Sequence, residues 1–178
     1  MGVKVSPPNL FKGMLLPPTY LYNHYKYSMK NDRKRKNVEQ MMYDANNDKE
    51  LLLERNIAKD LCYQFNQLIP SDQKNQSQIM VRLLGKTNGS FVILSPFWCD
   101  YGYNIEIGEN FFANHNTIIL DAAQVTFGNN VYIAPNCGFY TSSNPIDFER
   151  RNKGLEYAYP ITVGDNVWIG AVSKLCLA

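Results

Sequence analysis

The second half of the chain repeats one short pattern of apolar and polar residues. Three ten-residue segments begin apolar-x-apolar-Gly-x-Asn, and they start at Ile105, Val125 and Ile161. Residues i and i+2 of a β-strand share one face, so each segment predicts a pair of side chains that point inward. These pairs recur in steps of six residues, at positions 105, 111 and 117 and again at 125, 131 and 137. The predicted inward pairs are Ile105/Ile107, Phe111/Ala113, Thr117/Ile119, Val125/Phe127, Val131/Ile133, Cys137/Phe139, Ile161/Val163 and Val167/Ile169.

A strand-and-turn unit of six residues, used three times per coil, predicts a parallel β-helix with the shape of a triangular prism. The turns at 108–110, 128–130 and 164–166 read Gly-x-Asn, and both residue types tolerate positive φ. The alternative is an antiparallel barrel or sandwich of short strands, whose turns recur about every 8–12 residues. The shorter spacing in this chain favours the β-helix.

A helical segment precedes the repeats. Asn47 or Asp48 can cap its start, and Glu50 stands three residues after Asn47, which is the spacing of a capping box. We expect Glu54 and Arg55 to point away from the apolar face of this helix. The predicted apolar face consists of residues that recur every four positions, namely Leu53, Ile57, Leu61 and Phe65.

A second helix is predicted after Pro70-Ser71-Asp72, where the proline ends the first helix and the aspartate can cap the next. Gly85 is expected in the left-handed conformation at the end of this second helix. Its predicted buried side consists of Ile79, Met80, Leu83 and Leu84.

Three regions of the chain differ in character. Residues 1–28 contain two proline pairs, which exclude a continuous helix, and Met29 reads as a second start. We therefore hypothesise that residues 1–28 form an irregular leader that is not native to the folded protein. Residues 29–90 are the predicted helical segment and residues 91–178 the β-helix. A polar, turn-rich excursion loop at 141–160 interrupts the repeats, and such loops often carry function.

Composition excludes several classes of protein. A chain of 178 residues is long enough for one domain, and its net charge of +2 is too small to indicate a nucleic-acid partner. No segment approaches the roughly 20 apolar residues of a membrane span. The four cysteines show no CxxC spacing, which argues against a metal site and fits a reducing compartment. We expect a cytoplasmic protein with no metal and no membrane partner.

Several segments match a known family, namely 43–66, 96–102, 108–114, the loop 141–160 with its Gly-Leu-Glu-Tyr ending, and 160–170. Through them, residues 29–170 resemble the maltose and galactoside O-acetyltransferases. The resemblance implies a mainly β fold, in which a short α-helical N-terminal segment precedes a left-handed parallel β-helix of hexapeptide repeats. It also implies acetyl transfer from acetyl-CoA to a sugar or another small hydroxyl acceptor. A homotrimer is implied too, with active sites between neighbouring prisms.

The same resemblance implies roles for individual residues. Phe112 stands where many members have a tyrosine, and Trp168 and Ala171 correspond to coenzyme-binding positions. The positions that correspond to substrate-binding residues are Asp44, Arg55, Phe112, Asn114 and Glu156.

One departure from the family pattern concerns the residue that performs the catalysis. In the family, a histidine just before the proline of the excursion loop is the general base, whereas this chain has Asn144 before Pro145. An amide has no basic nitrogen near neutral pH, and the loss of a general base lowers a rate by roughly 10²–10⁴. The chain contains two histidines, His24 and His115. We interpret His115 as a solvent or interface residue, with substitution for the missing base as the alternative.

The end of the chain also differs from the family pattern. After Gly170 the family continues with further coils, whereas this chain reads Ala-Val-Ser-Lys-Leu-Cys-Leu-Ala. We expect the inward spacing to fail in this stretch, and we interpret the ending as a frameshift or a truncation. Together with Asn144 it supports an alternative function, that of a catalytically impaired relative or a truncated remnant.

Other proteins with the same prism fit less well. A β-helical carbonic anhydrase needs a zinc site of three histidines, and this chain has two histidines in all. Serine acetyltransferases and nucleotide-sugar acyltransferases share the prism, but their N-terminal domains differ from the helices predicted here.

Overall fold

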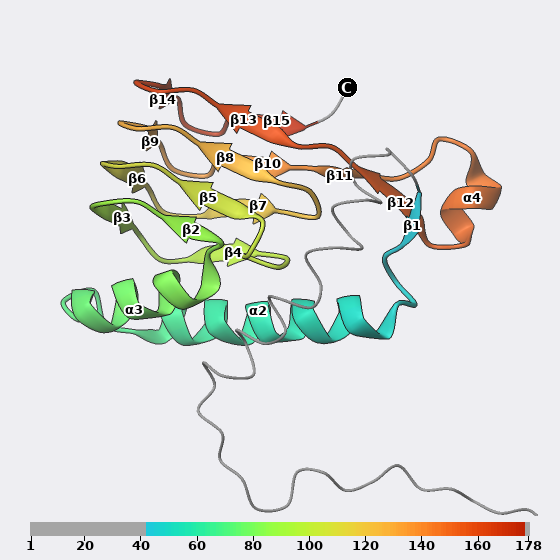
Figure 1. Ribbon diagram of the computed structural model, residues 1–178, viewed down its shortest axis with the longest axis horizontal. Helices are drawn as coiled ribbons and strands as arrows, with labels where there is room; N and C mark the ends of the chain where they lie inside the picture. Colours follow the sequence, from blue (N-terminus) through green and yellow to red (C-terminus); the bar gives the residue numbers. More distant parts are fainter. Residues whose placement is uncertain (1–41, 177–178) are drawn as a thin grey trace, which may run out of the picture.

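The computed structural model describes residues 42–176, and within them the repeats wind into a parallel β-helix of four coils (Figure 1). Each face of the prism is a four-stranded parallel sheet, with the strand orders β13-β8-β5-β2, β14-β9-β6-β3 and β15-β10-β7-β4. The predicted leader, residues 1–28, lies outside the described residues. From the first coil to the last, the strands are β2 (Lys86–Thr87), β3 (Phe91–Ile93), β4 (Phe97–Cys99), β5 (Ile105–Ile107), β6 (Phe111–Ala113), β7 (Thr117–Leu120), β8 (Val125–Phe127), β9 (Tyr132–Ile133), β10 (Gly138–Tyr140), β13 (Ile161–Val163), β14 (Trp168–Ile169) and β15 (Lys174–Cys176).

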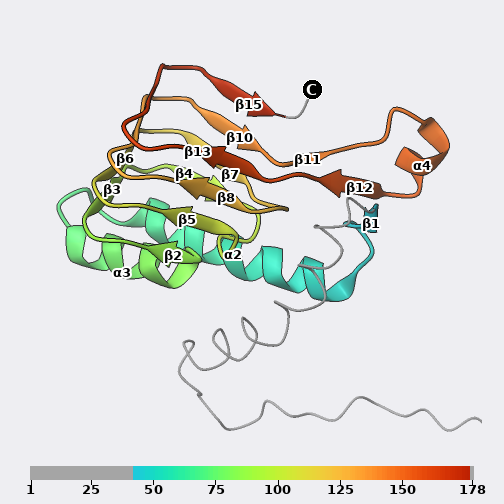
Figure 2. The same ribbon diagram turned by 45° about the horizontal axis from the view of Figure 1, so that its top comes forward.

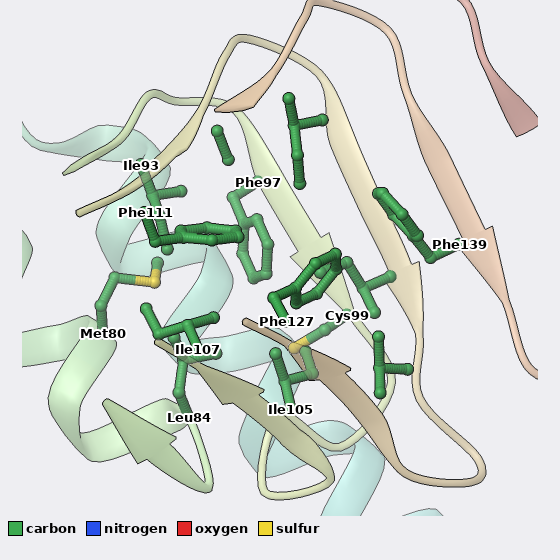
Figure 3. Close-up of a cluster of buried hydrophobic side chains, with 14 of the residues drawn as sticks. Met80, Leu84, Ile93, Phe97, Cys99, Ile105, Ile107, Phe111, Phe127 and Phe139 are labelled. Atoms are coloured by element: carbon green, nitrogen blue, oxygen red, sulfur yellow. The ribbon is translucent and has the colours of Figure 1, made fainter. Parts of the chain in front are cut away.

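The inward pairs predicted from the six-residue spacing form the core of the prism, which confirms that prediction. Successive coils pair in register, so Ile105 lies opposite Val125. The Phe127 ring lies 5.2 Å from the Phe111 ring and 5.0 Å from the Phe139 ring, centroid to centroid (Figure 3). Full burial of one such side chain stabilises the fold by about 1.5–3 kcal/mol.

Asparagines hold the corners of the coils. Asn110, Asn130 and Asn166 have φ values of 53°, 55° and 58°, in the left-handed region that asparagine tolerates better than most residues. Their side chains also form a ladder, because Asn110 Nδ2 donates to Asn130 Oδ1 and Asn130 Nδ2 donates to Asn166 Oδ1, each at 3.0 Å. The positive φ expected for the Gly-x-Asn turns is therefore found at the asparagine.

Two helices, α2 (Lys49–Gln67) and α3 (Gln73–Leu83), cover the first-coil end of the prism (Figures 1 and 2). Asp48 caps α2 by accepting hydrogen bonds from the backbone N–H groups of Glu50 and Leu51, and Asp72 caps α3. The buried side predicted for α3 is confirmed. No helix within residues 42–176 is long and apolar enough to cross a membrane.

The face predicted for α2 is partly wrong. Leu53 is 46% exposed, whereas Glu54, which was expected to point away, is buried. Steps of four residues advance by 40° more than a full turn, so Leu53 lies about 120° around the helix from Phe65. The face that packs on the prism alternates steps of three and four, through Leu51, Glu54, Ala58, Leu61 and Phe65.

Gly85 is needed for close contact and not for positive φ, which corrects the prediction for the end of α3. A Cβ at Gly85 would lie 2.1 Å from the Tyr103 carbonyl oxygen. Its N–H donates to the carbonyl oxygens of Gly102 and Ile105, at 3.1 and 2.9 Å. The first coil then begins at once with β2, within the region 29–90 that sequence analysis assigned to the helical segment.

The inward spacing continues to the end of the described chain, so the prediction that it fails after Gly170 is wrong. Strand β15 pairs in register with β10, and Leu175 lies opposite Phe139 and packs against the core. The departure is at the corner before β15, where Val172 has φ 64°. This corner corresponds to Asn116 and Asn136 in the two coils below it.

The excursion loop 141–160 contains three short elements, β11 (Ser142–Ser143), α4 (Phe148–Asn152) and β12 (Leu155–Ala158). Strand β12 pairs antiparallel with β11 on one side and with β1 (Tyr43–Asp44) on the other. The loop is therefore joined to the N-terminal part of the described chain by a three-stranded sheet, which projects from one side of the prism (Figure 2).

We predict that Val172→Asn stabilises the protein by about 1–2 kcal/mol, because a β-branched residue is strained in the left-handed region. The new amide also extends the ladder in which Asn116 Nδ2 donates to Asn136 Oδ1 at 2.9 Å. Thermal unfolding should show a higher Tm for this variant. Asn136→Val, the reverse change one coil below, should lower the Tm. An unchanged or lower Tm for Val172→Asn would show that the corner carries no strain.

Candidate active site

A cluster of polar side chains lies where β1, β12 and the first turns of α2 meet. Tyr43 is opposite Glu156 in the β1–β12 pair, and its hydroxyl donates to Glu156 Oε2 at 3.4 Å. From α2, Arg55 donates a hydrogen bond to the carbonyl oxygen of Ala45. Arg55 also acts electrostatically on Glu156 and on Asp100, which follows β4. We call Tyr43, Arg55, Asp100 and Glu156 the polar cluster.

The carboxyl groups of the polar cluster are partly removed from water. Burial raises the pKa of Glu156, while Arg55 and the Tyr43 hydroxyl act in the opposite direction. Burial likewise raises the pKa of Asp100, and Arg55 and Lys59 oppose the rise. Burial, with Glu156 nearby, raises the pKa of the Tyr43 hydroxyl, so this hydroxyl remains a hydrogen-bond donor at neutral pH. Two half-buried carboxylates beside one guanidinium can accept hydrogen bonds from a polyhydroxyl ligand.

Asp44 lies next to the cluster but is engaged in a turn. Its Oδ1 accepts hydrogen bonds from the backbone N–H groups of Asn46 and Asn47, at 3.2 and 2.9 Å. The Asn47 amide binds both carboxylate oxygens, and the Asn47 contacts contribute most to the lowered pKa of Asp44. Its role toward a substrate stays a prediction.

The turn that carries Asp100 is held by a residue that sequence analysis missed. Asp121 follows β7 and is completely buried. Its Oδ1 accepts hydrogen bonds from the backbone N–H groups of Asp100 at 3.1 Å and Tyr101 at 2.8 Å. Sequence carries little sign of this function, because Asp121 stands in an ordinary Asp-Ala-Ala stretch between two repeats.

A second set of predicted site residues lies on the sheet β14-β9-β6-β3. Outward side chains of this sheet stack in register as Val92, Phe112, Tyr132 and Trp168. The centroids of the Phe112 and Tyr132 rings are 6.4 Å apart, and the Trp168 side chain is 76% exposed. We call these four residues the aromatic face. Asn114 follows β6, and the exposed Ala171 follows β14.

Asn144 follows β11 in the excursion loop, where its side chain is exposed and makes no hydrogen bond to any residue among 42–176. His115 stands at the corner after Asn114, and its Nδ1 contacts the Ser95 carbonyl oxygen. A carbonyl oxygen only accepts, so Nδ1 carries the hydrogen and Nε2 is the basic nitrogen of the neutral ring. Within residues 42–176, no three His, Cys, Asp or Glu side chains gather into a group that could hold a metal ion.

The two sets do not meet within one chain. Strands β1, β11 and β12, which carry or adjoin Tyr43, Asn144 and Glu156, lie on one side of the prism, where the chain leaves β10 and returns to β13 (Figure 1). The aromatic face belongs to the sheet β14-β9-β6-β3, which runs through all four coils on the opposite side of the prism (Figures 1 and 2). A site that used both sets would need a second copy of the chain.

Comparison with known proteins agrees with this architecture. Residues 38–89 match the family model of the maltose acetyltransferase hexapeptide capping motif. A solved maltose O-acetyltransferase of Clostridium difficile 630 is 40% identical, with a TM-score of 0.77 over 81% of this chain and 76% of that one. The chain belongs to the maltose and galactoside O-acetyltransferase family.

Two further acetyltransferases are similar to this chain in structure or in sequence. A solved galactoside acetyltransferase in complex with coenzyme A is 32% identical, with a TM-score of 0.77 over 81% of this chain and 72% of that one. A protein of Saccharomyces cerevisiae named as an acetyltransferase is 55% identical over 129 residues. These cover 72% of this chain and 66% of the yeast protein, so the chain spans about two thirds of that relative's length. The family resemblance predicted from sequence is confirmed, and so is the left-handed parallel β-helix.

We predict that Arg55→Gln raises the pKa of both Asp100 and Glu156, because the guanidinium lowers both. Lys59→Gln is the matched control, since Lys59 acts on Asp100 and should leave Glu156 unchanged. Carboxyl ¹³C shifts followed against pH measure each group separately. An equal rise at Glu156 in both variants would show that Arg55 is not part of the polar cluster.

Proposed function

We propose that this protein transfers the acetyl group of acetyl-CoA to a hydroxyl group of a sugar. The acceptor oxygen attacks the thioester carbonyl carbon, an ester C–O bond forms and the C–S bond breaks. The hydroxyl proton ends on the sulfur of coenzyme A. Family membership supports the reaction class, and the polar cluster supports the acceptor class. Half-buried carboxylates beside Arg55 suit the hydroxyl groups of a neutral carbohydrate, which donate hydrogen bonds to them.

The separation of the two residue sets supports a homotrimer with each site between two chains. In such a site, one chain supplies the polar cluster and Asn144, and its neighbour supplies Phe112, Asn114 and the rest of the aromatic face. Trp168 would then present its exposed ring to the coenzyme, together with Ala171. The aromatic face is the kind of exposed apolar surface that marks an interface or a ligand site.

The reacting proton needs a base, and Asn144 cannot supply one. We therefore infer that the chain transfers acetyl groups slowly, and a catalytically impaired relative that still binds sugar is the second candidate function. His115 is the alternative base, because its Nδ1 contacts the Ser95 carbonyl oxygen and no residue among 42–176 hydrogen-bonds its Nε2, the acceptor nitrogen of the ring. It lies next to Asn114 and therefore on the side that a neighbouring chain would contribute.

The first test is acetyl transfer to maltose and to a galactoside by the purified chain and by Asn144→His. We predict that the variant raises kcat by roughly 10²–10⁴, the usual contribution of general-base catalysis. Asn152→His places a histidine in α4 of the same loop and should change nothing. Transfer by the unchanged chain that is lost in His115→Gln would assign the base to His115. No transfer by any of these proteins, with sugar binding intact, would support the impaired relative.

The second test is the oligomeric state. We predict that Tyr132→Glu converts trimers to monomers in analytical ultracentrifugation, because it buries a charge in the proposed interface. Thr162→Glu is the control, since Thr162 is an exposed residue of β13 on another face of the prism. A monomeric unchanged chain, or a trimeric Tyr132→Glu, would contradict an interface on the aromatic face.

A further inference from the structure

The carboxylate of Asp121 is the centre of a compact hydrogen-bond arrangement. Besides the N–H groups of Asp100 and Tyr101 on Oδ1, the Asn104 N–H donates to Oδ2 at 3.3 Å. The Asn104 side-chain amide in turn donates a hydrogen bond to the backbone carbonyl oxygen of Asp121 at 2.7 Å. One buried side chain therefore fixes both ends of the turn from Asp100 to Asn104. Hydrogen bonds from three backbone N–H groups to an ionised carboxylate are stronger than hydrogen bonds between neutral groups.

This turn connects the prism to the polar cluster. Its first residue, Asp100, lies in the field of Arg55, while Tyr101 is buried against Leu51 of α2. Its fourth residue, Tyr103, donates from its hydroxyl to Glu54 Oε2 at 2.6 Å. The position of the Asp100 carboxylate relative to Arg55 thus depends on the conformation of the turn, which Asp121 sets.

We propose that Asp121 is a positioning residue for the acceptor: it holds Asp100 where its carboxylate accepts a hydrogen bond from a sugar hydroxyl. This inference rests on the proposed function, because it takes the polar cluster to be the acceptor site. Asp121 itself is too deeply buried to touch the sugar.

The charges around Asp121 make the arrangement sensitive to pH. The pKa of Asp121 is raised to about 7, mainly by burial and also by the nearby Asp100 carboxylate, while hydrogen bonds from the backbone N–H groups oppose the rise. The thiols of Cys62 on α2 and Cys99 on β4 also face it, while Arg55 and Lys59 act on its neighbour Asp100. A protonated carboxyl is a weaker acceptor for the three N–H groups, so the turn loosens as the pH falls through about 7.

The same fall in pH that loosens the turn should increase the global stability of the protein. A folded-state pKa above the ordinary value means that the folded protein holds this proton more tightly than the unfolded chain does. Through this group, stability therefore increases as the pH falls from about 7 toward about 4. Weaker acceptor binding at acid pH without a loss of thermal stability is the result that distinguishes local positioning from general unfolding.

The test compares Asp121→Asn with Asp165→Asn, in which a corner carboxylate that accepts one backbone N–H, from Asn129 at 2.6 Å, is changed in the same way. Maltose and a galactoside are the probes, and calorimetry gives their Kd. Asp121→Asn should weaken sugar binding by about tenfold, the usual effect of losing a hydrogen bond to a charged group. Asp165→Asn should leave sugar binding unchanged, and neither variant should change the KM for acetyl-CoA.

Two further measurements separate positioning from a merely structural role. In a double-mutant cycle, Asp121→Asn should have little additional effect on sugar binding once Asp100→Asn is present, because both act through one carboxylate. In the unchanged protein, the amide ¹⁵N shifts of Asp100, Tyr101 and Asn104 should share one titration step near pH 7. The second measurement needs no variant, so it decides even if Asp121→Asn does not fold.

Additive effects in the cycle, unchanged sugar binding in Asp121→Asn, or no shared amide step would each overturn the positioning role. Sugar binding with the expected cycle but no acetyl transfer would leave the positioning role intact and refute the proposed function. Absence of sugar binding by the unchanged protein would overturn the positioning role directly.

Discussion

Ile105, Val125 and Ile161 lie in register on three successive coils, and columns of this kind fill the inside of the prism. The contact between stacked inward side chains is the interaction on which the other features depend. Each coil gains its apolar burial from the coils on either side, and the corners can be tight only because asparagine accepts the left-handed conformation there. The helices α2 and α3 extend the same principle by covering the first coil with Leu61, Phe65 and Met80.

The strands were predictable because their spacing is set by the fold itself. A period of six places every second residue of each strand in a column, and no other common arrangement of strands has this period. The errors arose where a residue's role depends on its neighbours in space. Leu53 matches a four-residue spacing but faces solvent, and Gly85 resembles a helix cap but is required by the Tyr103 carbonyl oxygen. Ser173 and Leu175 remain inward although the corner residue before them is a valine.

The site was predictable only as far as individual residues match a family pattern. Arg55 and Glu156 come together because β1 pairs with β12, which places positions 113 residues apart side by side at Tyr43 and Glu156. Asp100 and Asp121 were both missed. Asp121 leaves no periodic or spacing signal, because it is a buried carboxylate that binds backbone N–H groups, and Asp100 depends on the turn that Asp121 holds. The division of the predicted residues into two distant sets was also invisible in sequence, because linear order says nothing of which face a corner presents.

Helix α2 links the stability of the prism to the chemistry of the polar cluster. Its buried side covers the first coil, and its first turns supply Arg55 and the Glu54 carboxylate that accepts from Tyr103. The helix cannot shift on the prism without moving the guanidinium relative to Asp100 and Glu156. The excursion loop is bound by the same constraint, because β12 is paired to β1, which leads directly into α2. A polar site assembled from a cap helix, a coil turn and a loop can keep its geometry only when the first coil is fully packed, so changes deep in the core should reach the site through α2.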